Sequence, residues 1–260
     1  MSRLLHSRWV HVVAIVISLF AGAFSTAANA QTPYCWLSCS QASISGLYIG
    51  GELVKNWGAV QTTERSAVTN TVTNIYSDRA DPFGGGVLVG VKTAPLGGFW
   101  VISPFASFDF IRSPVNHNFP GGSYLGTTAT FIGTGGIKTG PQFDNGVWLY
   151  GIAGGSVMNE TLNVNFVPTL SALPVTVTGG TLGGGAAFQP IFLQGFARQV
   201  SVFLEYQHTW WWDAHFQTPA ANPGSNYTFR RQDDIVKLGF TVSLYAPPSA
   251  PAMITKAPSK

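Results

Sequence analysis

Apolar and polar residues alternate along much of the chain between residues 46 and 245. A period of two indicates β-strands that expose one apolar face and one polar face. Eight segments show it, at 46–57, 83–93, 99–112, 124–139, 146–157, 177–189, 199–211 and 234–245. The pattern is clearest in 199–211, where Val200, Val202, Leu204 and Tyr206 alternate with Ser201, Glu205, Gln207 and Thr209. In 146–157 both phases are apolar, and 177–189 is rich in glycine, so the pattern does not define their facing.

The connections between these segments alternate in length. Long segments (58–82, 113–123, 158–176 and 212–233) alternate with short ones (94–98, 140–145 and 190–198). Long loops on one side and short turns on the other are typical of outer-membrane barrels. A soluble β-sandwich shares the alternation, but carries more surface Lys and Glu and less loop asymmetry. We therefore predict an all-β fold, an eight-stranded antiparallel up-and-down transmembrane β-barrel over residues 46–245.

Composition supports a chain that contacts lipid. Only 10% of the residues are charged, whereas a soluble domain carries ~25%. Residues 161–197 contain no Asp, Glu, Lys or Arg, but Pro168, Pro174 and Pro190 are incompatible with a spanning helix there. A closed barrel can cross lipid without helices. The net charge is only +3, without a basic cluster, so nucleic-acid binding is excluded.

Residues 1–30 have the three parts of a secretory signal peptide. Basic Arg3, His6 and Arg8 precede an apolar run at 9–20, and 28–30 read Ala-Asn-Ala. The alternative is an uncleaved membrane anchor. Cleavage removes Arg3 and Arg8, so the basic count falls from 14 to 12 against 11 acids and the mature chain is almost neutral.

The segment 31–45 is predicted to be periplasmic and holds the two cysteines of the chain, Cys35 and Cys39. In an oxidising compartment they form a local disulfide, or else remain two free thiols. A zinc site would need further ligands such as a histidine pair, which does not follow them. We expect no metal and no cofactor.

The polar phase of the strands carries three acids and three bases. In a bilayer barrel this phase faces the lumen, which places six charges there: Glu52, Lys92, Asp109, Lys138, Glu205 and Lys237. Charges in so narrow a space should pair, because an unpaired buried charge is costly. Two interpretations remain, a packed polar plug that holds the barrel shape and a gate for small solutes or protons.

Aromatic residues gather at the ends of the predicted strands. Trp57 and the Trp210–Trp212 triplet lie on the long-loop side, and Phe99, Trp100 and Tyr245 on the short-turn side. Trp and Tyr settle at headgroup level, so an aromatic girdle is expected. The alternative for the triplet is a platform that binds a sugar or haem.

Three segments and the last strand resemble a known family. The sequence GLYIGG at 46–51 resembles the G-F-Y-x-G-G opening strand of small outer-membrane barrel proteins of the alphaproteobacterial surface-antigen type, within the OmpA-like and opacity-like porin group. LYGIAGG at 149–155 and VFLEY at 202–206 are similar to their L-Y-G-x-G-G and V-x-x-E-Y strands. The last strand resembles the barrel-assembly signal at Lys237, Gly239, Val242 and Leu244.

This resemblance implies a location in the bacterial outer membrane and insertion by the barrel-assembly machinery with periplasmic chaperones. It implies contact with outer-membrane lipids and lipopolysaccharide, and a structural, envelope-integrity and surface-exposed role with porin-like passage of small solutes as an option. Because some relatives are linked to haem, the alternative function is surface binding of haem or another small ligand. The chain departs from the family in its Pro-rich tail at 246–260, expected to be periplasmic, and in its CWLSC segment. The oligomeric state stays open.

An enzymatic role, as a lipid A hydrolase or a protease, is the third option. A serine hydrolase needs a histidine beside its serine, and the only histidines after the signal peptide are His117, His208 and His215. No His–Ser pair stands out. Asp213, His215, Asp233 and Asp234 can meet near the last long loop as an acid–histidine set, or form a solvated rim. We expect a protein that is not an enzyme.

Overall fold

The computed structural model describes residues 46–93, 99–119, 124–143, 147–166, 169–188, 200–216 and 224–244. The predicted signal peptide, the segment with Cys35 and Cys39, Tyr245 and the tail 246–260 lie outside the described residues. Within the described residues, no helix is long and apolar enough to span a membrane.

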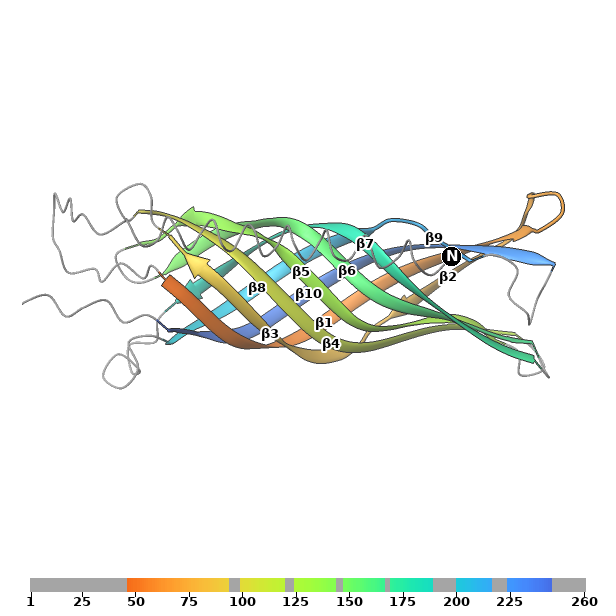
Figure 1. Cartoon of the computed structure of the whole chain (residues 1–260), viewed down its shortest axis with the longest axis horizontal. Helices are drawn as coiled ribbons and strands as arrows, with labels where there is room; N and C mark the ends of the chain where they lie inside the picture. The colour runs from red at the N-terminus through yellow and green to blue at the C-terminus, as the bar shows by residue number, and fades with distance from the viewer. Residues whose placement is uncertain are drawn as a thin grey trace, which may run out of the picture.

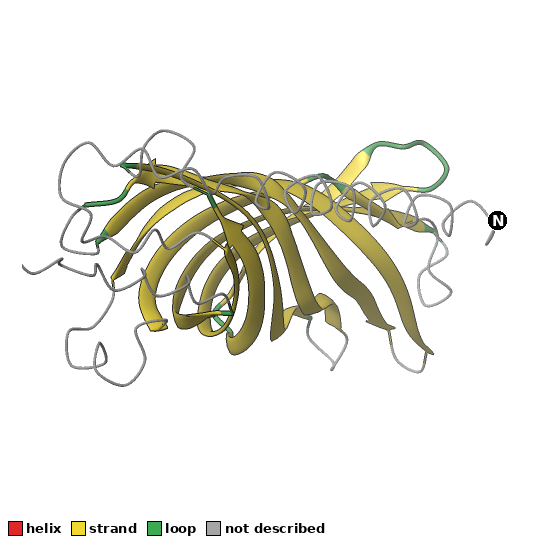
Figure 2. Cartoon of the chain, turned by 60° about the vertical axis from the view of Figure 1, so that its left-hand side comes forward, coloured by secondary structure: helices red, strands yellow, loops and turns green. Residues whose placement is uncertain are grey.

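The described residues form ten strands in one antiparallel sheet. They are β1 (Gly46–Ser66), β2 (Val72–Ala80), β3 (Phe83–Lys92), β4 (Trp100–Asn118), β5 (Tyr124–Pro141), β6 (Trp148–Phe166), β7 (Thr169–Phe188), β8 (Val200–Trp211), β9 (Ala214–Phe216) and β10 (Ser225–Ser243). Their order in the sheet is β2-β1-β3-β4-β5-β6-β7-β8-β10-β9. β1 also pairs with β10, from Tyr48 with Ser243 to Ser66 with Ser225, so the sheet closes on itself. Figures 1 and 2 show the inclined strands wrapped around a common axis.

Each of the eight predicted segments overlaps a different strand, and β2 and β9 are additional. β1 pairs with β3 up to Lys55 and with β2 from Gly58 onward, so β2 continues β3 along the same neighbour. Asp81 and Pro82 interrupt them, because proline has no N–H for the ladder. β9 likewise continues β8 beside β10 after a break at Trp212 and Asp213.

The strands are longer than predicted, because they run far into the expected long loops. β1 reaches Ser66, β4 reaches Asn118, β6 reaches Phe166, and β10 starts at Ser225. We call the end of the sheet near Ser66 the loop side and the end near Gly46 the turn side. The four long segments are therefore mostly strand rather than loop, and only their tips connect strands.

The two faces of the sheet exchange character along its length. On the turn side of β1, Glu52 is buried inside and Leu53 is exposed outside; on the loop side, Val60 is buried inside and Gln61 is exposed outside. The inner face thus changes from polar to apolar, and the outer face from apolar to polar. A loop-side cluster of buried apolar residues fills the interior, among them Val60, Val115, Leu162, Tyr227 and Phe229.

On the loop side the closed sheet divides into two. β4 pairs with β3 only up to Phe110, and β7 pairs with β8 only up to Gly179. Beyond these residues the strands form one group of β2, β1, β10 and β9 and a second group of β4, β5, β6 and β7. Figure 1 shows the two groups diverging at its right-hand end. The buried apolar cluster packs between them, as in a sandwich.

One strand faces differently from the prediction. Lys138 was predicted to face the lumen, and an unbroken alternation would place Thr128 and Thr130 there too and Leu125 and Ala129 toward lipid. Instead, Leu125 and Ala129 are buried and Thr130 is exposed. The register between β5 and β6 shifts between Ala129 and Phe131, so that β5 carries one extra residue there. Such a bulge moves every later side chain to the opposite face. Beyond it, Thr134 and Lys138 are buried inside.

Candidate functional site

The interior of the turn-side half holds a cation between two carboxylates. Lys237 on β10 is fully buried, and its Nζ lies 2.9 Å from Glu52 Oε1 on β1 and 2.6 Å from Asp109 Oδ2 on β4. The same ammonium donates a hydrogen bond to Ser107 Oγ at 3.1 Å. The strand alternation aims these side chains inward from three different strands. We call Lys237, Glu52 and Asp109 the Lys237 cluster.

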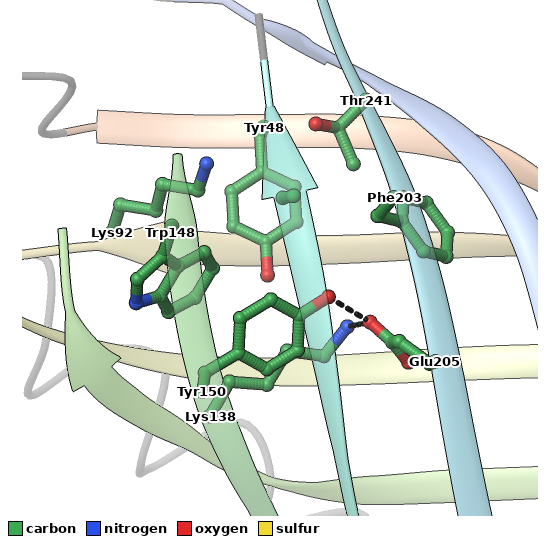
Figure 3. A pocket seen from close by; sticks show the side chains of 9 residues that line it. Tyr48, Lys92, Lys138, Trp148, Tyr150, Phe203, Glu205 and Thr241 are labelled. Carbon is green, nitrogen blue, oxygen red and sulfur yellow. Dashed lines mark hydrogen bonds and ion pairs between the residues drawn. The ribbon is translucent and has the colours of Figure 1, made fainter. Parts of the chain in front are cut away.

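A second ion pair crosses the interior from β5 to β8. The Lys138 ammonium contacts the Glu205 carboxylate, and Tyr150 Oη donates to Glu205 Oε1 at 2.8 Å (Figure 3). The other carboxylate oxygen accepts from Gln207 Nε2 at 3.1 Å. The Lys138 Nζ also lies 4.6 Å from the centre of the Phe105 ring, a favourable cation–π arrangement. Glu205 therefore has partners at both oxygens.

Lys92 is the one of the six predicted lumen charges that lies outside these two ion-paired groups. It is buried at the turn-side end, and its Nζ lies 4.9 Å from the Trp148 ring centre and 5.6 Å from that of Tyr48. Within the described part of the chain, no carboxylate lies within ion-pair distance of Lys92. Aromatic faces rather than an acid thus surround this cation.

Aromatic side chains fill the space between these charges. A cavity of about 10 Å³ remains there, lined by Tyr48, Lys92, Lys138, Trp148, Tyr150, Ala187, Phe203, Glu205 and Thr241 (Figure 3). A cavity of that size holds one water molecule at most. The Tyr48 ring lies against Gly90, where an added Cβ would come within 2.3 Å of the phenol oxygen. Glycine at this position therefore makes room for the ring.

On the loop side of the Lys138–Glu205 pair, hydroxyl groups form a continuous hydrogen-bonded chain across β5, β6, β7 and β8. Thr134 and Ser156 lie 2.9 Å apart, Ser156 and Thr181 2.6 Å, and Thr181 and Thr209 2.8 Å, oxygen to oxygen. Each hydroxyl can donate one hydrogen bond and accept another. This layer satisfies the polar interior of β5 to β8 without additional charge.

A further charged cluster lies where the sheet divides, and the sequence prediction missed it. Arg231 on β10 is buried, with its Nε 2.9 Å from Asp233 Oδ2 and its Nη1 3.5 Å from Glu160 Oε1 on β6. Arg231 Nη2 donates to Ser113 Oγ on β4 at 3.0 Å, and Trp211 Nε1 donates to Asp233 Oδ2 at 2.6 Å. Arg231 therefore connects the two groups of strands. Residues 227, 229, 231 and 233 alternate inward, which was a readable signal inside the supposed loop.

Glu64 organises the loop-side end of β1, β2 and β10. Its carboxylate accepts hydrogen bonds from Ser225 Oγ at 2.6 Å, Asn74 Nδ2 at 2.8 Å, Tyr76 Oη at 3.2 Å and Tyr227 Oη at 3.3 Å. Burial alone would raise the pKa of Glu64, but these donors outweigh it and hold the pKa below its usual value. The carboxylate is therefore ionised at neutral pH and ties the tips of three strands together.

The acid–histidine set weighed from the sequence does not converge. Asp233 faces inward to Arg231, whereas Asp234 lies on the outer face, 2.7 Å from His208 Nδ1. Asp213 pairs with Arg230, and His215 Nδ1 lies 3.1 Å from Thr228 Oγ1. His117 Nδ1 on β4 lies 3.4 Å from Asp78 Oδ1 on β2. Over the described ranges, no group of three or more His, Cys, Asp or Glu is arranged to hold a metal ion.

The tryptophan triplet is divided between the two faces. Trp210 and Trp212 are exposed outside together with Trp57, while Trp211 is 4% exposed and binds Asp233 inside. A continuous three-ring platform is therefore absent, because successive residues of a strand point in opposite directions. Phe99 and Trp100 are exposed at the turn side.

The residues that resemble an assembly signal occupy the turn-side end of β10. Lys237 is buried in its cluster, and Gly239 lies close to the Phe203 ring, since an added Cβ would come within 2.5 Å of it. Val242 is half-buried, and Leu244, just after the strand, is exposed. Lys237 thus has a structural contact network apart from any signal.

Comparison with known proteins gives matches in structure alone. No family model matches the chain, and no curated protein matches it in sequence. Among solved structures, the outer membrane protease OmpT from Escherichia coli matches with a TM-score of 0.50 and 8% identity, over 79% of this chain and 99% of that one. Neisserial surface protein A matches with a TM-score of 0.36 and 12% identity, over 76% and 97%, and Ail of Yersinia pestis with 0.35 and 11%, over 74% and 98%.

The OmpT match defines the class of fold. At 8% identity it shows a shared arrangement of strands and nothing about activity. The chain therefore has the fold of a bacterial outer-membrane protein, an all-β antiparallel sheet whose strands follow one another in sequence order around the ring.

Proposed function

We propose that this chain is an eight-stranded up-and-down β-barrel of the bacterial outer membrane, with a closed lumen and a structural, surface-exposed role. The count of eight follows if β2 with β3 and β8 with β9 are single strands, each interrupted once. Closure supports a membrane location because it leaves no unpaired edge in the spanning part.

The outer face of the turn-side half supports contact with lipid. Large apolar side chains are exposed there on every strand of the ring, including Ile49, Leu53, Val87, Phe110, Ile137, Leu149, Leu182, Leu204, Leu238 and Phe240. A continuous apolar patch of this extent is unfavourable in water. It ends near Trp57, Trp210 and Trp212, and outward residues closer to the loop-side end, such as Gln61 and Arg230, are polar. We infer that these indoles mark the membrane surface, as in an aromatic girdle.

The closed lumen is the observation that carries the proposed role. The Lys237 cluster, the Lys138–Glu205 pair and the aromatic rings fill the turn-side half, and the cavity between them is about 10 Å³. An eight-stranded barrel has an interior that side chains can fill. We propose that these contacts hold the barrel shape, and that the loop-side sheets are presented at the cell surface. Insertion would use the barrel-assembly machinery and periplasmic chaperones.

We also propose that the protein is not an enzyme. The division of Asp233 and Asp234 between opposite faces supports it, because a catalytic set must converge on one substrate atom. His215 is exposed outside and contacts Thr228.

A pair of arginine substitutions on β1 tests the membrane location. Leu53 and Gln61 both point outward and are exposed, but Leu53 lies within the proposed lipid band and Gln61 above it. In lipid vesicles we expect Leu53→Arg to lower the free energy of unfolding by about 2–4 kcal/mol, because a lipid-facing arginine near the midplane is costly. Gln61→Arg should change it by less than about 0.5 kcal/mol.

The readout is the difference in gel migration between heated and unheated samples as denaturant is increased. Native protein should show this difference and should sediment with the outer-membrane fraction. Equal stability of the two variants, or recovery of the protein in the soluble fraction, would contradict the membrane barrel.

A further inference from the structure

A hollow lies outside the barrel, on the loop-side half of β4, β5 and β6. Its volume is about 500 Å³, and it is lined by Arg112, Pro114, Asn116, Tyr124, Thr128, Thr130, Thr161 and Asn163. We call it the outer groove. Its lining offers hydroxyls, amides, one phenol and one guanidinium, and none of these residues is acidic. That volume lies within the range of small-molecule sites.

Two register shifts place this groove. The pairing of β4 with β5 shifts between Phe110 and Ser113, and that of β5 with β6 between Ala129 and Phe131. Bulges bend a strand and increase its twist. The second shift also turns Thr128 and Thr130 to the outer face, where the sequence pattern had placed apolar residues. Thr128 and Thr130 therefore line the groove because of the bulge.

Arg112 is the charged group of the groove. Two other outward cations are paired, Lys55 with Asp81 and Arg230 with Asp213. For Arg112, the structure shows no carboxylate partner among the residues that it describes. An exposed guanidinium can bind a phosphate through two parallel N–H donors.

An aromatic platform adjoins the groove on its turn side. Phe108, Phe110 and Phe131 are outward neighbours, with ring centres 5.0 Å apart for Phe108 and Phe110 and 4.9 Å apart for Phe108 and Phe131. Phe110 is 60% exposed and is two residues before Arg112 on the same face of β4. From the proposed lipid band toward the loop side, the outer surface thus presents an apolar patch, then a cation, and then a polar groove.

We propose that the outer groove binds the phosphorylated sugar headgroup of lipopolysaccharide. Arg112 binds a phosphate, the side chains of Asn116, Thr128 and Thr161 bind sugar hydroxyls, and the three phenylalanines contact acyl chains. Asn163 donates from its Nδ2 to Thr128 Oγ1 at 3.2 Å, which orients that hydroxyl. This inference rests on the proposed function, because the outer-membrane location puts the groove at the headgroup level of the outer leaflet.

The test measures binding of fluorescently labelled lipopolysaccharide to the folded full-length protein in detergent micelles. We expect Arg112→Gln to weaken binding about tenfold, the effect of losing a charged hydrogen bond. Arg230→Gln, a control at another exposed arginine, should bind as the native protein does. With lipopolysaccharide stripped of its phosphates, native protein and Arg112→Gln should bind alike.

Two results would overturn the site. One is equal binding of phosphorylated lipopolysaccharide by native protein and a folded Arg112→Gln variant. The other is displacement of the lipid by soluble glucosamine phosphate at the same concentration as unlabelled lipopolysaccharide, which would assign the groove to a free sugar phosphate. Failure of the membrane barrel itself is distinguished by the Leu53 and Gln61 variants, whose stabilities do not depend on Arg112.

Discussion

Replacing Lys237 with methionine is expected to lower the free energy of unfolding by about 3–5 kcal/mol, the cost of removing one partner from a buried ion pair. Glu52 and Asp109 would remain buried, and their carboxylates would lose the cation that lies within 3 Å of both. The measurement is denaturant unfolding in lipid vesicles, followed by gel migration without heating.

Two controls show whether the loss comes from the unpaired charges. Lys55→Met removes an exposed lysine paired with Asp81 and should cost less than about 1 kcal/mol. The triple variant Lys237→Met, Glu52→Gln and Asp109→Asn removes the charges together and should recover most of the lost stability. If Lys237→Met is as stable as Lys55→Met, the interior cluster does not hold the barrel.

The second large loss of stability is expected from replacing Arg231, and it should be confined to the loop side. Arg231→Met leaves Asp233 and Glu160 buried without their cation, and removes the bond to Ser113 that connects the two groups of strands. We expect local protection to fall by about 3–5 kcal/mol on the loop side. Hydrogen exchange measures it, as faster exchange of the amides of β4 and β10 beyond the girdle and unchanged exchange near Gly46.

The neighbouring arginine supplies a matched control. Arg230 is adjacent in sequence but points outward, where it is 3.2 Å from Asp213 at an exposed site. Arg230→Met should leave the exchange of both regions unchanged, because exposed ion pairs contribute little. Loss of protection spread evenly over the barrel in Arg231→Met would contradict a local connecting role.

The period-two pattern was sufficient to predict which side chains of the turn-side strands face inward. Glu52, Lys138 and Lys237 were all expected inside, and all three are buried there. The reason is physical: one face meets an apolar exterior, so any charge on the strand must be on the other face. The pairing of particular charges was not readable, because it depends on which strands lie opposite each other across the ring.

The long segments were predicted to be loops because their alternation is reversed: apolar residues face inward and polar residues outward. In 225–233, Tyr227, Phe229 and Arg231 face inward and polar residues face outward, the arrangement of a water-exposed sheet around an apolar core. A barrel criterion that seeks polar-inside residues does not find it. The bulge near Thr130 was equally hidden, because a one-residue insertion leaves no mark in composition. The reversed alternation and the bulge both lie on the loop side, which also holds the outer groove and the contacts of Arg231 with Asp233 and Glu160.

Ion conductance of the folded protein in a planar lipid bilayer tests the closed lumen most directly. The filled interior, with a cavity of about 10 Å³ between its charges, predicts no steady current steps above the bare-bilayer level, while a wide-lumen porin prepared in the same way conducts. Stable open-channel steps from native protein that shows heat-modifiable migration would contradict a closed lumen.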